Sequence, residues 1–388
     1  MIIIEQILKK IKGIKKPLTK FLSDIVITIF STQGKINFRN LSRYSDYHEK
    51  TISRNFKASK VNFPDLNENL IKRVSMEESI MAVDASFIKK SGKNTYGIGK
   101  FWDGKNSKSE KGLEISALAI IDVKDNTAYA VDIKQTPSKL DTDKSRVDFY
   151  TKQIVDNKDI LTEAKHIVGD GYYTKIKFVN GVIESGRNYV GKLRKDANLK
   201  YYYYGKKTGK KGKPKTYLGK VDLSKPDFDY VCDLEDDYKL YTKIVYSVIL
   251  KRKIKLAYKT NGKTSHIYFS TDLELSAQKI HQYYQKRYQI EYLFRDSKNH
   301  LGLEDCMSTD EKVLSFHFNI SMTALNFAKV DDKMNRNERT PFSIINYKRR
   351  IHNEKMLKLF IFKFALDPNF PINQNEYLEL LNFGTISA

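Results

Sequence analysis

Residues 114–134, EISALAIIDVKDNTAYAVDIK, indicate the fold class most directly. Two apolar runs, each long enough for a β-strand, flank the turn-forming residues Lys124-Asp125-Asn126. Another apolar run, IMAVDASFI, precedes them at 80–88 and has a single carboxylate, Asp84, in its middle. The three runs therefore predict three strands that follow one another along the chain.

Helical and extended segments alternate after these strands. Residues 145–161 predict a helix, and residues 164–169, AKHIVG, predict a strand that ends at Asp170. A short helix and a further strand at 188–193 follow. Three strands followed by helix, strand, helix and strand are typical of a mixed α/β fold.

The residue composition and the predicted secondary structure change again in the second half of the chain. Residues 194–263 are rich in Gly, Lys and Tyr and predict a β-rich insertion. Residues 276–302, SAQKIHQYYQKRYQIEYLFRDSKNHLG, predict one long helix that Gly302 ends. Another helix is expected near 313–330, and helices are expected from there to the C-terminus.

The N-terminal 75 residues also predict helices. Within them, residues 36–57 resemble a helix-turn-helix in which Asp46 caps the second helix, and an ordinary helical hairpin is the alternative. The first sixteen residues, MIIIEQILKKIKGIKK, predict an amphipathic helix rather than a signal peptide, because they lack a small-residue cleavage site.

The positive charge of the chain is large and clustered. It holds 69 Lys and Arg against 46 Asp and Glu, a formal net charge of +23. Basic residues concentrate in three zones, at 1–75, 194–220 and 238–263. A charge of this size indicates a polyanionic partner, and three zones favour nucleic acid along an extended track over a merely solvated, lysine-rich surface.

Composition excludes several other classes of protein. Hydrophobic residues at 40% and charged residues at 30% fit a folded chain, and no apolar run approaches the ~18 residues of a membrane helix. The two cysteines, Cys232 and Cys306, cannot form a disulfide framework or a Cys-based zinc site. We therefore expect a cytoplasmic, nucleoid-associated protein without a membrane partner. No phosphate-binding loop motif occurs, so no nucleotide cofactor is expected.

Four residues of the predicted 276–302 helix form the sharpest chemical pattern. Tyr284, Arg287, Glu291 and Lys298 follow one another at +3, +4 and +7 and fall within a helical stripe about 60° wide. An acid flanked by two cations and a tyrosine suits a metal ion and a phosphodiester. The competing interpretation is a solvated helix face with ordinary ion pairs.

Two acids on the predicted strands complete the pattern. Asp84 lies in mid-strand, where an unpaired charge is costly to bury, and Asp170 follows a strand between two glycines. Together with Glu291 they would repel one another unless cations neutralise them. Two Mg²⁺ (or Mn²⁺) ions about 3.5–4 Å apart would do so and would activate a water or a 3′-OH. The alternatives are a hydrogen-bonded structural role for Asp84 and a turn or cap role for Asp170.

These residues carry a resemblance to a known family. Tyr284-x2-Arg287-x3-Glu291-x6-Lys298 resembles the YREK signature of cut-and-paste transposases from bacterial insertion sequences, family four in the usual grouping. AVDASFIKK around Asp84 and VGDGYYTK around Asp170 resemble the surroundings of the first two acids of that family's DDE triad. The resemblance covers residues 79–330. It implies an RNase H-like core, a mixed sheet with flanking helices, that a β-rich insertion interrupts.

The resemblance also implies roles for individual residues. It implies catalytic acids that bind the metal ions, namely Asp84, Asp170 and Glu291. It implies contacts with the DNA backbone beside the scissile phosphate, namely Tyr284, Arg287, Lys298 and Lys175. The neighbouring acids are interpreted as structural, namely Asp122, Asp132, Asp141 and Asp143.

The predicted regions follow from the pattern and the resemblance together. They are a helical DNA-binding region at 1–75, the first part of the catalytic core at 76–193, the basic insertion at 194–263, the last part of the core at 264–330 and a helical C-terminal region at 331–388. The implied protein is a DNA transposase that binds the double-stranded ends of its element and cleaves and joins strands into target DNA, as a homodimer on DNA. A non-catalytic DNA-binding regulator derived from a transposase and a metal-dependent structure-specific nuclease are the alternatives.

Overall fold

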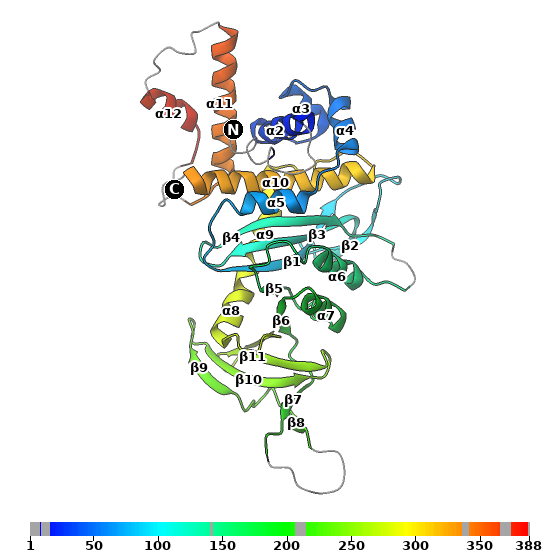
Figure 1. Ribbon diagram of the computed structural model, residues 1–388, viewed down its shortest axis with the longest axis vertical. Coiled ribbons are helices and arrows are strands. Elements are labelled where there is room, and N and C mark those ends of the chain that lie inside the picture. Colours follow the sequence, from blue (N-terminus) through cyan, green and yellow to red (C-terminus); the bar gives the residue numbers. More distant parts are fainter. Residues whose placement is uncertain are drawn as a thin grey trace.

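One twelve-stranded sheet runs through most of the length of the molecule, with helices gathered at one end (Figure 1). The computed structural model describes residue 8 and residues 16–139, 143–205, 215–335, 341–364 and 374–386. Most of the predicted N-terminal amphipathic helix, at 1–7 and 9–15, and also Asp141 lie outside the described residues.

Five strands form the part of the sheet that the sequence predicts as the core. They are β1 (Ser79–Lys89), β3 (Lys108–Asp122), β4 (Thr127–Gln135), β5 (His166–Val168) and β6 (Asn188–Leu193). Their order is β4-β3-β1-β5-β6; β3 is antiparallel to both β1 and β4, while β5 and β6 run parallel to β1. This is the order and direction of an RNase H-like sheet, so the expected fold class is confirmed. β2 (Gly99–Asp103) pairs with the beginning of β3.

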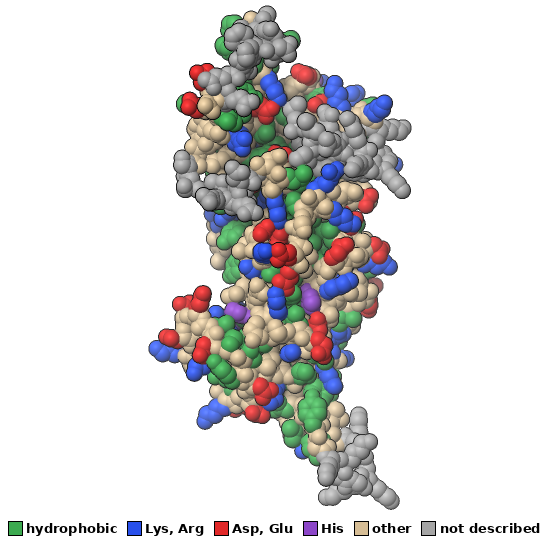
Figure 2. Space-filling model, turned by 60° about the vertical axis from the view of Figure 1, so that its left-hand side comes forward, with side chains coloured by type: hydrophobic (Ala, Val, Ile, Leu, Met, Phe, Trp, Pro, Cys, Tyr) green, Lys and Arg blue, Asp and Glu red, His purple; other side chains and the backbone are tan. Residues whose placement is uncertain are grey.

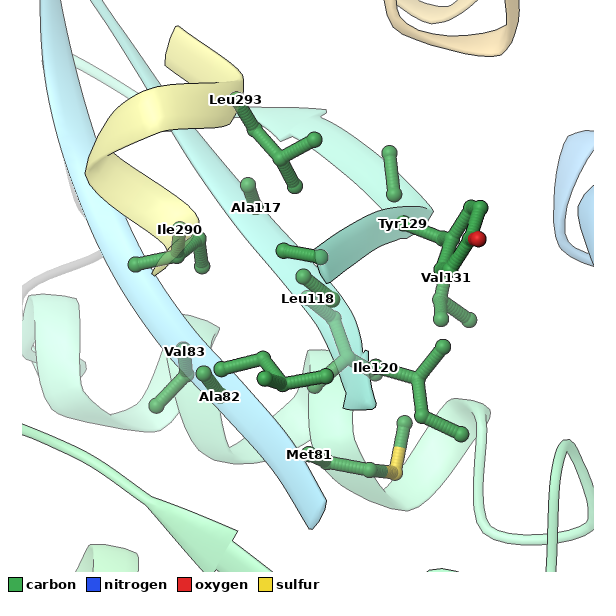
Figure 3. Close-up of a cluster of buried hydrophobic side chains, with 14 of the residues drawn as sticks. Met81, Ala82, Val83, Ala117, Leu118, Ile120, Tyr129, Val131, Ile290 and Leu293 are labelled. Atoms are coloured by element: carbon green, nitrogen blue, oxygen red, sulfur yellow. The ribbon is translucent and has the colours of Figure 1, made fainter. Parts of the chain in front are cut away.

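Helices cover both faces of this core. α6 (Arg146–Asp156) and α7 (Ile176–Glu184) pack together on one face. The opposite face receives α9 (Gln289–His300) and α10 (Glu311–Asn335). Ile290 and Leu293 of α9 point towards the strands that carry Ala82 and Ala117, and all four side chains are completely buried (Figure 3). This packing fixes the position of α9 along the length of β1.

The remaining strands extend the same sheet. They are β12 (Ser265–Ser270), β11 (Arg252–Thr260), β10 (Lys239–Ser247), β9 (Asp229–Asp233), β7 (Leu199–Tyr202) and β8 (Tyr217–Lys220). β12 pairs with β6 on one side and with β11 on the other, and the order continues through β10 and β7 to β8. The predicted insertion thus contains strands, and these strands are hydrogen-bonded to the core rather than forming a sheet of their own.

The predicted single helix at 276–302 is two helices, so this expectation is wrong. α8 (Ala277–Lys286) and α9 are separated at Arg287 and Tyr288, where the amides of 287, 288, 290 and 291 bond to carbonyls three residues back. Such a turn is tighter than an α-helix, with about three residues per turn. It occurs where the Arg287 side chain enters the protein, and it means that Tyr284 and Glu291 do not share one straight helical face.

Helices from both ends of the chain pack together beyond the core. They are α2 (Lys16–Ser31), α3 (Phe38–Arg43), α4 (Glu49–Ala58), α5 (Phe63–Ile71), α11 (Ile344–Lys363) and α12 (Gln374–Asn382). Phe56 anchors α4 on Phe316 of α10, with ring centres 4.4 Å apart. α4 begins after His48, whose Nδ1 accepts the Lys50 amide at 3.2 Å, so the expected Asp46 cap is wrong. No helix among the described residues has both the length and the hydropathy that a membrane crossing requires.

Candidate active site

Arg287 joins two of the predicted catalytic acids. Its Nη1 donates to Oδ2 of Asp84 at 3.0 Å, and its Nη2 donates to Oε1 of Glu291 at 2.8 Å. Asp84 comes from the middle of β1, and Glu291 lies in the first turn of α9, where the helix dipole favours a carboxylate. The packing of α9 on the sheet therefore places acids from distant parts of the sequence around one guanidinium.

Asp84 is the most perturbed acid of this group. Its side chain is only 20% exposed, and burial raises its pKa to about 7. Arg287 and the backbone amide of Ala85 oppose this rise, whereas the charges of Asp170 and Glu291 add to it. Arg287 is the only cation in direct contact with these acids among the described residues, so three carboxylates outnumber the positive charge that faces them. A site with this imbalance favours a further cation.

Asp170 lies in the loop between β5 and α7, close enough to Asp84 for its charge to raise the pKa of the Asp84 carboxyl. Its Oδ1 accepts the backbone amide of Tyr172 at 2.8 Å, and its backbone oxygen accepts the hydroxyl of Tyr189 at 3.2 Å. These bonds hold the loop against the end of the sheet. Because β1 and β5 are parallel neighbours, the loop after β5 lies beside the middle of the longer β1.

The two predicted phosphate contacts on α8 and α9 have defined partners. The ring of Tyr284 packs against that of Tyr268, tilted by 32° and with centres 4.5 Å apart, and burial raises the pKa of Tyr284 to about 12. Lys298 donates from Nζ to the backbone oxygen of Phe87 at 2.5 Å and forms an ion pair with Glu304 at 3.2 Å. Lys298 thus touches β1 three residues beyond Asp84.

Lys175 lies on the same loop as Asp170, at the beginning of α7. Its Nζ is 4.0 Å from the centre of the Tyr172 ring, and both side chains are exposed. The structure therefore gathers Asp84, Arg287 and Glu291 into direct contact. Within the described residues it shows no contact of Lys175 or Lys298 with these acids.

The three carboxylates are chemically suited to a divalent metal ion, but the guanidinium of Arg287 lies between two of them, Asp84 and Glu291. Carboxylate oxygens are the ligands that Mg²⁺ and Mn²⁺ prefer. In the described parts of the chain, no group of three Asp, Glu, His or Cys side chains is close enough together to hold a metal ion in the present arrangement. The Nε of Arg287 is buried without a hydrogen-bond partner among these residues. The guanidinium is therefore incompletely satisfied, and its departure from the acids would open the space between them.

Sequence reasoning missed a row of exposed tyrosines at the start of α9, from its N-cap Tyr288 onwards. Tyr288 and Tyr292 project to solvent one turn apart, and the guanidinium of Arg295 lies 4.5 Å from the Tyr292 ring centre. Arg287 itself lies 5.1 Å from the Tyr288 ring centre. The i, i+4 spacing of the tyrosines was visible in the sequence, but their exposure depends on which face of α9 packs on the sheet.

Two of the neighbouring acids have structural partners, as expected. Asp132 is buried and accepts from Asn157 Nδ2 at 2.9 Å and from Gln153 Nε2 at 3.3 Å. Asp122 pairs with Lys333 at 3.0 Å. Neither acid faces Arg287.

Comparison with known proteins identifies the family. Residues 75–327 match the family profile described as "Transposase DDE domain". The chain belongs to the DDE transposase family. Because members of this family cleave DNA and join DNA strands, the protein is a DNA-binding DNA transposase, and the family generally uses divalent metal ions. The matched region of this transposase contains all three predicted acids, Arg287 and Lys298.

Solved structures show weaker likeness to the transposase. A piggyBac transposase synaptic complex with hairpin DNA is 11% identical, with a TM-score of 0.41 over 100% of this chain and 82% of the other. Endonuclease V from Bacillus subtilis is 12% identical, with a TM-score of 0.24 over 80% of this chain and 96% of the other. At these TM-scores neither likeness adds to the family assignment. No curated protein sequence matches the chain significantly.

Proposed function

We propose that this transposase is of the insertion-sequence family-four type with a YREK signature, and that Asp84, Asp170 and Glu291 are its catalytic acids. The observation that carries the proposal is the double hydrogen bond of Arg287 to Asp84 and Glu291. A solvated helix face with ordinary ion pairs would not reach a buried carboxylate in mid-strand. The bonds therefore favour the catalytic interpretation over that alternative.

The three acids would hold two divalent ions, Mg²⁺ or Mn²⁺, which supply Lewis-acid activation of a water or a 3′-OH and stabilise the leaving oxygen. Arg287 would leave the acids and donate to oxygens of the scissile phosphodiester, whose geometry its planar fork matches. Tyr284, held by Tyr268, would donate its hydroxyl to the same backbone. Lys298 and Lys175 would bind the neighbouring phosphates.

The insertion offers a second contact with DNA. The rings of Tyr202, Tyr217 and Tyr246 lie together, with Tyr217 and Tyr246 centres 5.0 Å apart. Lys253 lies 4.8 Å from the Tyr202 ring centre, and Lys200 lies 5.3 Å from that of Tyr217. We call these five residues the Tyr–Lys cluster. Aromatic rings and ammonium groups together suit bases and phosphates, which supports a DNA-binding role for the basic zone at 194–220.

The ends of the chain would complete the complex on nucleoid DNA. We propose that residues 1–75 recognise the element ends, that 76–193 and 264–330 form the catalytic core around the 194–263 insertion, and that 331–388 pair two subunits as a homodimer. Support for the last point comes from Phe360 and Phe362 on α11 and from Phe383 directly after α12, all of which are exposed. Large exposed apolar patches commonly mark protein interfaces.

The decisive experiment uses the purified chain and a DNA fragment that carries the flanks of its own gene. Wild type and Glu291→Gln are compared with Mg²⁺ and with a chelator; Glu77→Gln, an exposed acid paired with Lys124, is the matched control. We expect cleavage at the flank boundary by wild type and Glu77→Gln with Mg²⁺, and a loss of more than about 1,000-fold in Glu291→Gln.

The other outcomes assign the alternatives. Tight, salt-sensitive binding without cleavage by wild type would show a DNA-binding regulator. Cleavage that ignores the flanks would show a general or structure-specific nuclease. Unchanged cleavage by Glu291→Gln would remove this residue from the catalytic acids.

Figure 2 shows the distribution of charge on one side of the molecule. Several acidic side chains lie close together near the middle of this face with Lys and Arg side chains around them, and further acidic side chains are mixed with basic ones above and below. A DNA backbone placed over such a face would meet cations on both sides of a short acidic zone. That pattern is the one expected where metal ions, rather than side chains, neutralise the phosphate to be cut.

A further inference from the structure

The hairpin of β2 and β3 exposes the only tryptophan of the chain. Trp102 is 61% exposed, although an indole is among the side chains that gain most from burial. Its neighbour Phe101 is buried, and the guanidinium of Arg146 lies 4.6 Å from the Phe101 ring centre. The hairpin is thus anchored on one face by Phe101 and presents Trp102 on the other.

Strand register places Trp102 on the same face of the sheet as Asp84. Asp84 pairs with Ala117 of β3, and Trp102 pairs with Ser109 of β3. Directly paired residues share a face, and so do residues an even number apart along one strand. The eight residues from Ser109 to Ala117 contain no register shift against β1 or β2. The indole of Trp102 and the carboxylate of Asp84 therefore lie on the same face of the sheet.

The surroundings of Trp102 on this face are basic. Lys100 and Lys111 pair across the hairpin next to Trp102, and both are exposed. The two acids of the hairpin are engaged elsewhere: Asp103 accepts from Asn106 at 2.7 Å, and Glu110 pairs with Lys108 at 2.8 Å. Within the hairpin, the face of Trp102 carries two lysines and no acid.

The distance along β3 between Ser109 and Ala117 shows how far Trp102 lies from Asp84 and the proposed cleavage site. Eight residues at about 3.3 Å each give roughly 26 Å between the Trp102 and Asp84 levels. At about 3.4 Å per nucleotide this is roughly eight nucleotides of a DNA strand. Trp102 is too far away to touch the base beside the scissile phosphate, so its contact would lie on the DNA that leaves the active site.

We propose that Trp102 stacks on an unpaired or unstacked DNA base roughly eight nucleotides from the cleavage point, while Lys100 and Lys111, which lie side by side between Trp102 and the level of Asp84, bind phosphates of the same strand nearer the cut. The proposal rests on the DNA-binding function of the family. A protein partner fits the surface less well, since protein interfaces are depleted of lysine at their centres. An indole beside two ammonium groups suits a base and its neighbouring phosphates.

A single tryptophan makes the test direct. The full chain, kept from cutting by a chelator, is titrated with three fluorescein-labelled DNAs of the same mixed sequence: a 40-base-pair duplex, that duplex with three unpaired nucleotides in its middle, and the single strand. Anisotropy reports binding, while tryptophan emission and its accessibility to acrylamide report Trp102. We expect quenching by half or more and strong acrylamide protection with the two DNAs that have unpaired bases.

Variants separate stacking from simple exposure. Trp102→Ala should weaken binding of the interrupted duplex about tenfold and of the intact duplex less than twofold, and Trp102→Phe should restore most of the affinity. Tyr230→Ala is the matched control, because Tyr230 is exposed on β9 beside Asp229 and Asp233. It should change neither affinity.

Each other outcome is decisive. DNA binding with unchanged emission and unchanged acrylamide access overturns the role of Trp102 and leaves the family function intact. Protection of Trp102 that depends on protein concentration without DNA assigns the surface to contact between copies of the chain, and overturns the proposal. Failure of wild type to bind any of the three DNAs contradicts DNA binding itself, and the proposal falls with it.

Discussion

Arg287 donates a hydrogen bond of 3.0 Å to Asp84 and so connects the junction of α8 and α9 to the middle of β1. Burial lowers the pKa of Arg287, but the carboxylates of Asp84 and Glu291 raise it by more. The guanidinium is the cation that allows these acids to lie together in the absence of metal. Two measurable consequences concern this arrangement, and two more concern a buried lysine and the exposed C-terminal phenylalanines.

Arg287→Ala should destabilise the metal-free protein by about 2–4 kcal/mol, because it leaves the buried Asp84 carboxylate without its partner. Millimolar Mg²⁺ should recover part of this loss, since a bound cation replaces the missing charge. Urea unfolding with Mg²⁺ and with a chelator measures both effects. Arg295→Ala, which removes an exposed guanidinium paired with Asp296, is the control and should cost less than about 1 kcal/mol. An equal cost for both variants would contradict the role of Arg287.

Leu293→Ala should lower the free energy of unfolding by about 2–5 kcal/mol, because Leu293 is completely buried between α9 and the sheet. Strand cleavage should fall below that of wild type even where the variant is fully folded, because the cavity loosens the helix that carries Glu291. Val155→Ala, partly exposed on α6, should change neither quantity appreciably. Normal cleavage by folded Leu293→Ala would show that the packing of α9 does not position Glu291.

Lys329→Met should stabilise the protein near pH 7, with a gain that shrinks as the pH rises. Lys329 is buried on α10, and burial lowers its pKa from 10.5 to about 8. Between these values the unfolded chain binds more protons than the folded one, so wild-type stability rises with pH in this window. Below pH 8 wild type bears the cost of a buried charge.

The expected gain at pH 7 is about 1–3 kcal/mol, reduced by the lost hydrogen bond from Lys329 to the backbone oxygen of Ala128. Thermal unfolding of both proteins from pH 6 to pH 10.5 tests it. A difference between the two proteins that does not change with pH would exclude the titration of Lys329 as the cause.

Replacing Phe362 and Phe383 by Ser should weaken self-association of the chain. Their side chains are 79% and 78% exposed on and after the C-terminal helices α11 and α12. Burial of two such side chains in a dimer contributes several kcal/mol, so the dissociation constant should rise by at least tenfold. Sedimentation equilibrium, with and without DNA, measures this. Leu218→Ser, exposed at the other end of the molecule, should leave association unchanged; a monomeric wild type on DNA would rule out the proposed pairing.

The sequence predicted those parts of the fold that depend on local pattern. The apolar run at 80–88 is β1 almost to the residue, and the runs on either side of Lys124-Asp125-Asn126 are β3 and β4. Asp84 stood out because a lone carboxylate within an apolar strand needs a partner. Its partner, Arg287, belongs to the predicted pattern of Tyr284, Arg287, Glu291 and Lys298, but the bond between Arg287 and Asp84 was not predicted.

The features that were not predicted depend on contacts between distant segments. Helical periodicity assumes a constant turn, so it could not show the tightening at Arg287. The pairing of β12 with β6 joins strands from separate parts of the chain, and no local pattern encodes it. His48 caps α4 through a ring nitrogen, whereas residue preferences favoured the carboxylate of Asp46. The exposure of Trp102 follows from the side of β2 that Arg146 covers.

The unbroken sheet fixes the distance between Asp84 and the Tyr–Lys cluster. From β1 to β10 there are five inter-strand steps, through β5, β6, β12 and β11, or about 24 Å at roughly 4.8 Å per step. No linker interrupts this series of hydrogen-bonded strands, so the Tyr–Lys cluster and Asp84 keep a constant separation whatever sequence is bound. If both sites bind one DNA end as proposed, the position of the cut would be set by length, about seven base pairs from the Tyr–Lys cluster, and a change in the number of strands between the two sites would move it.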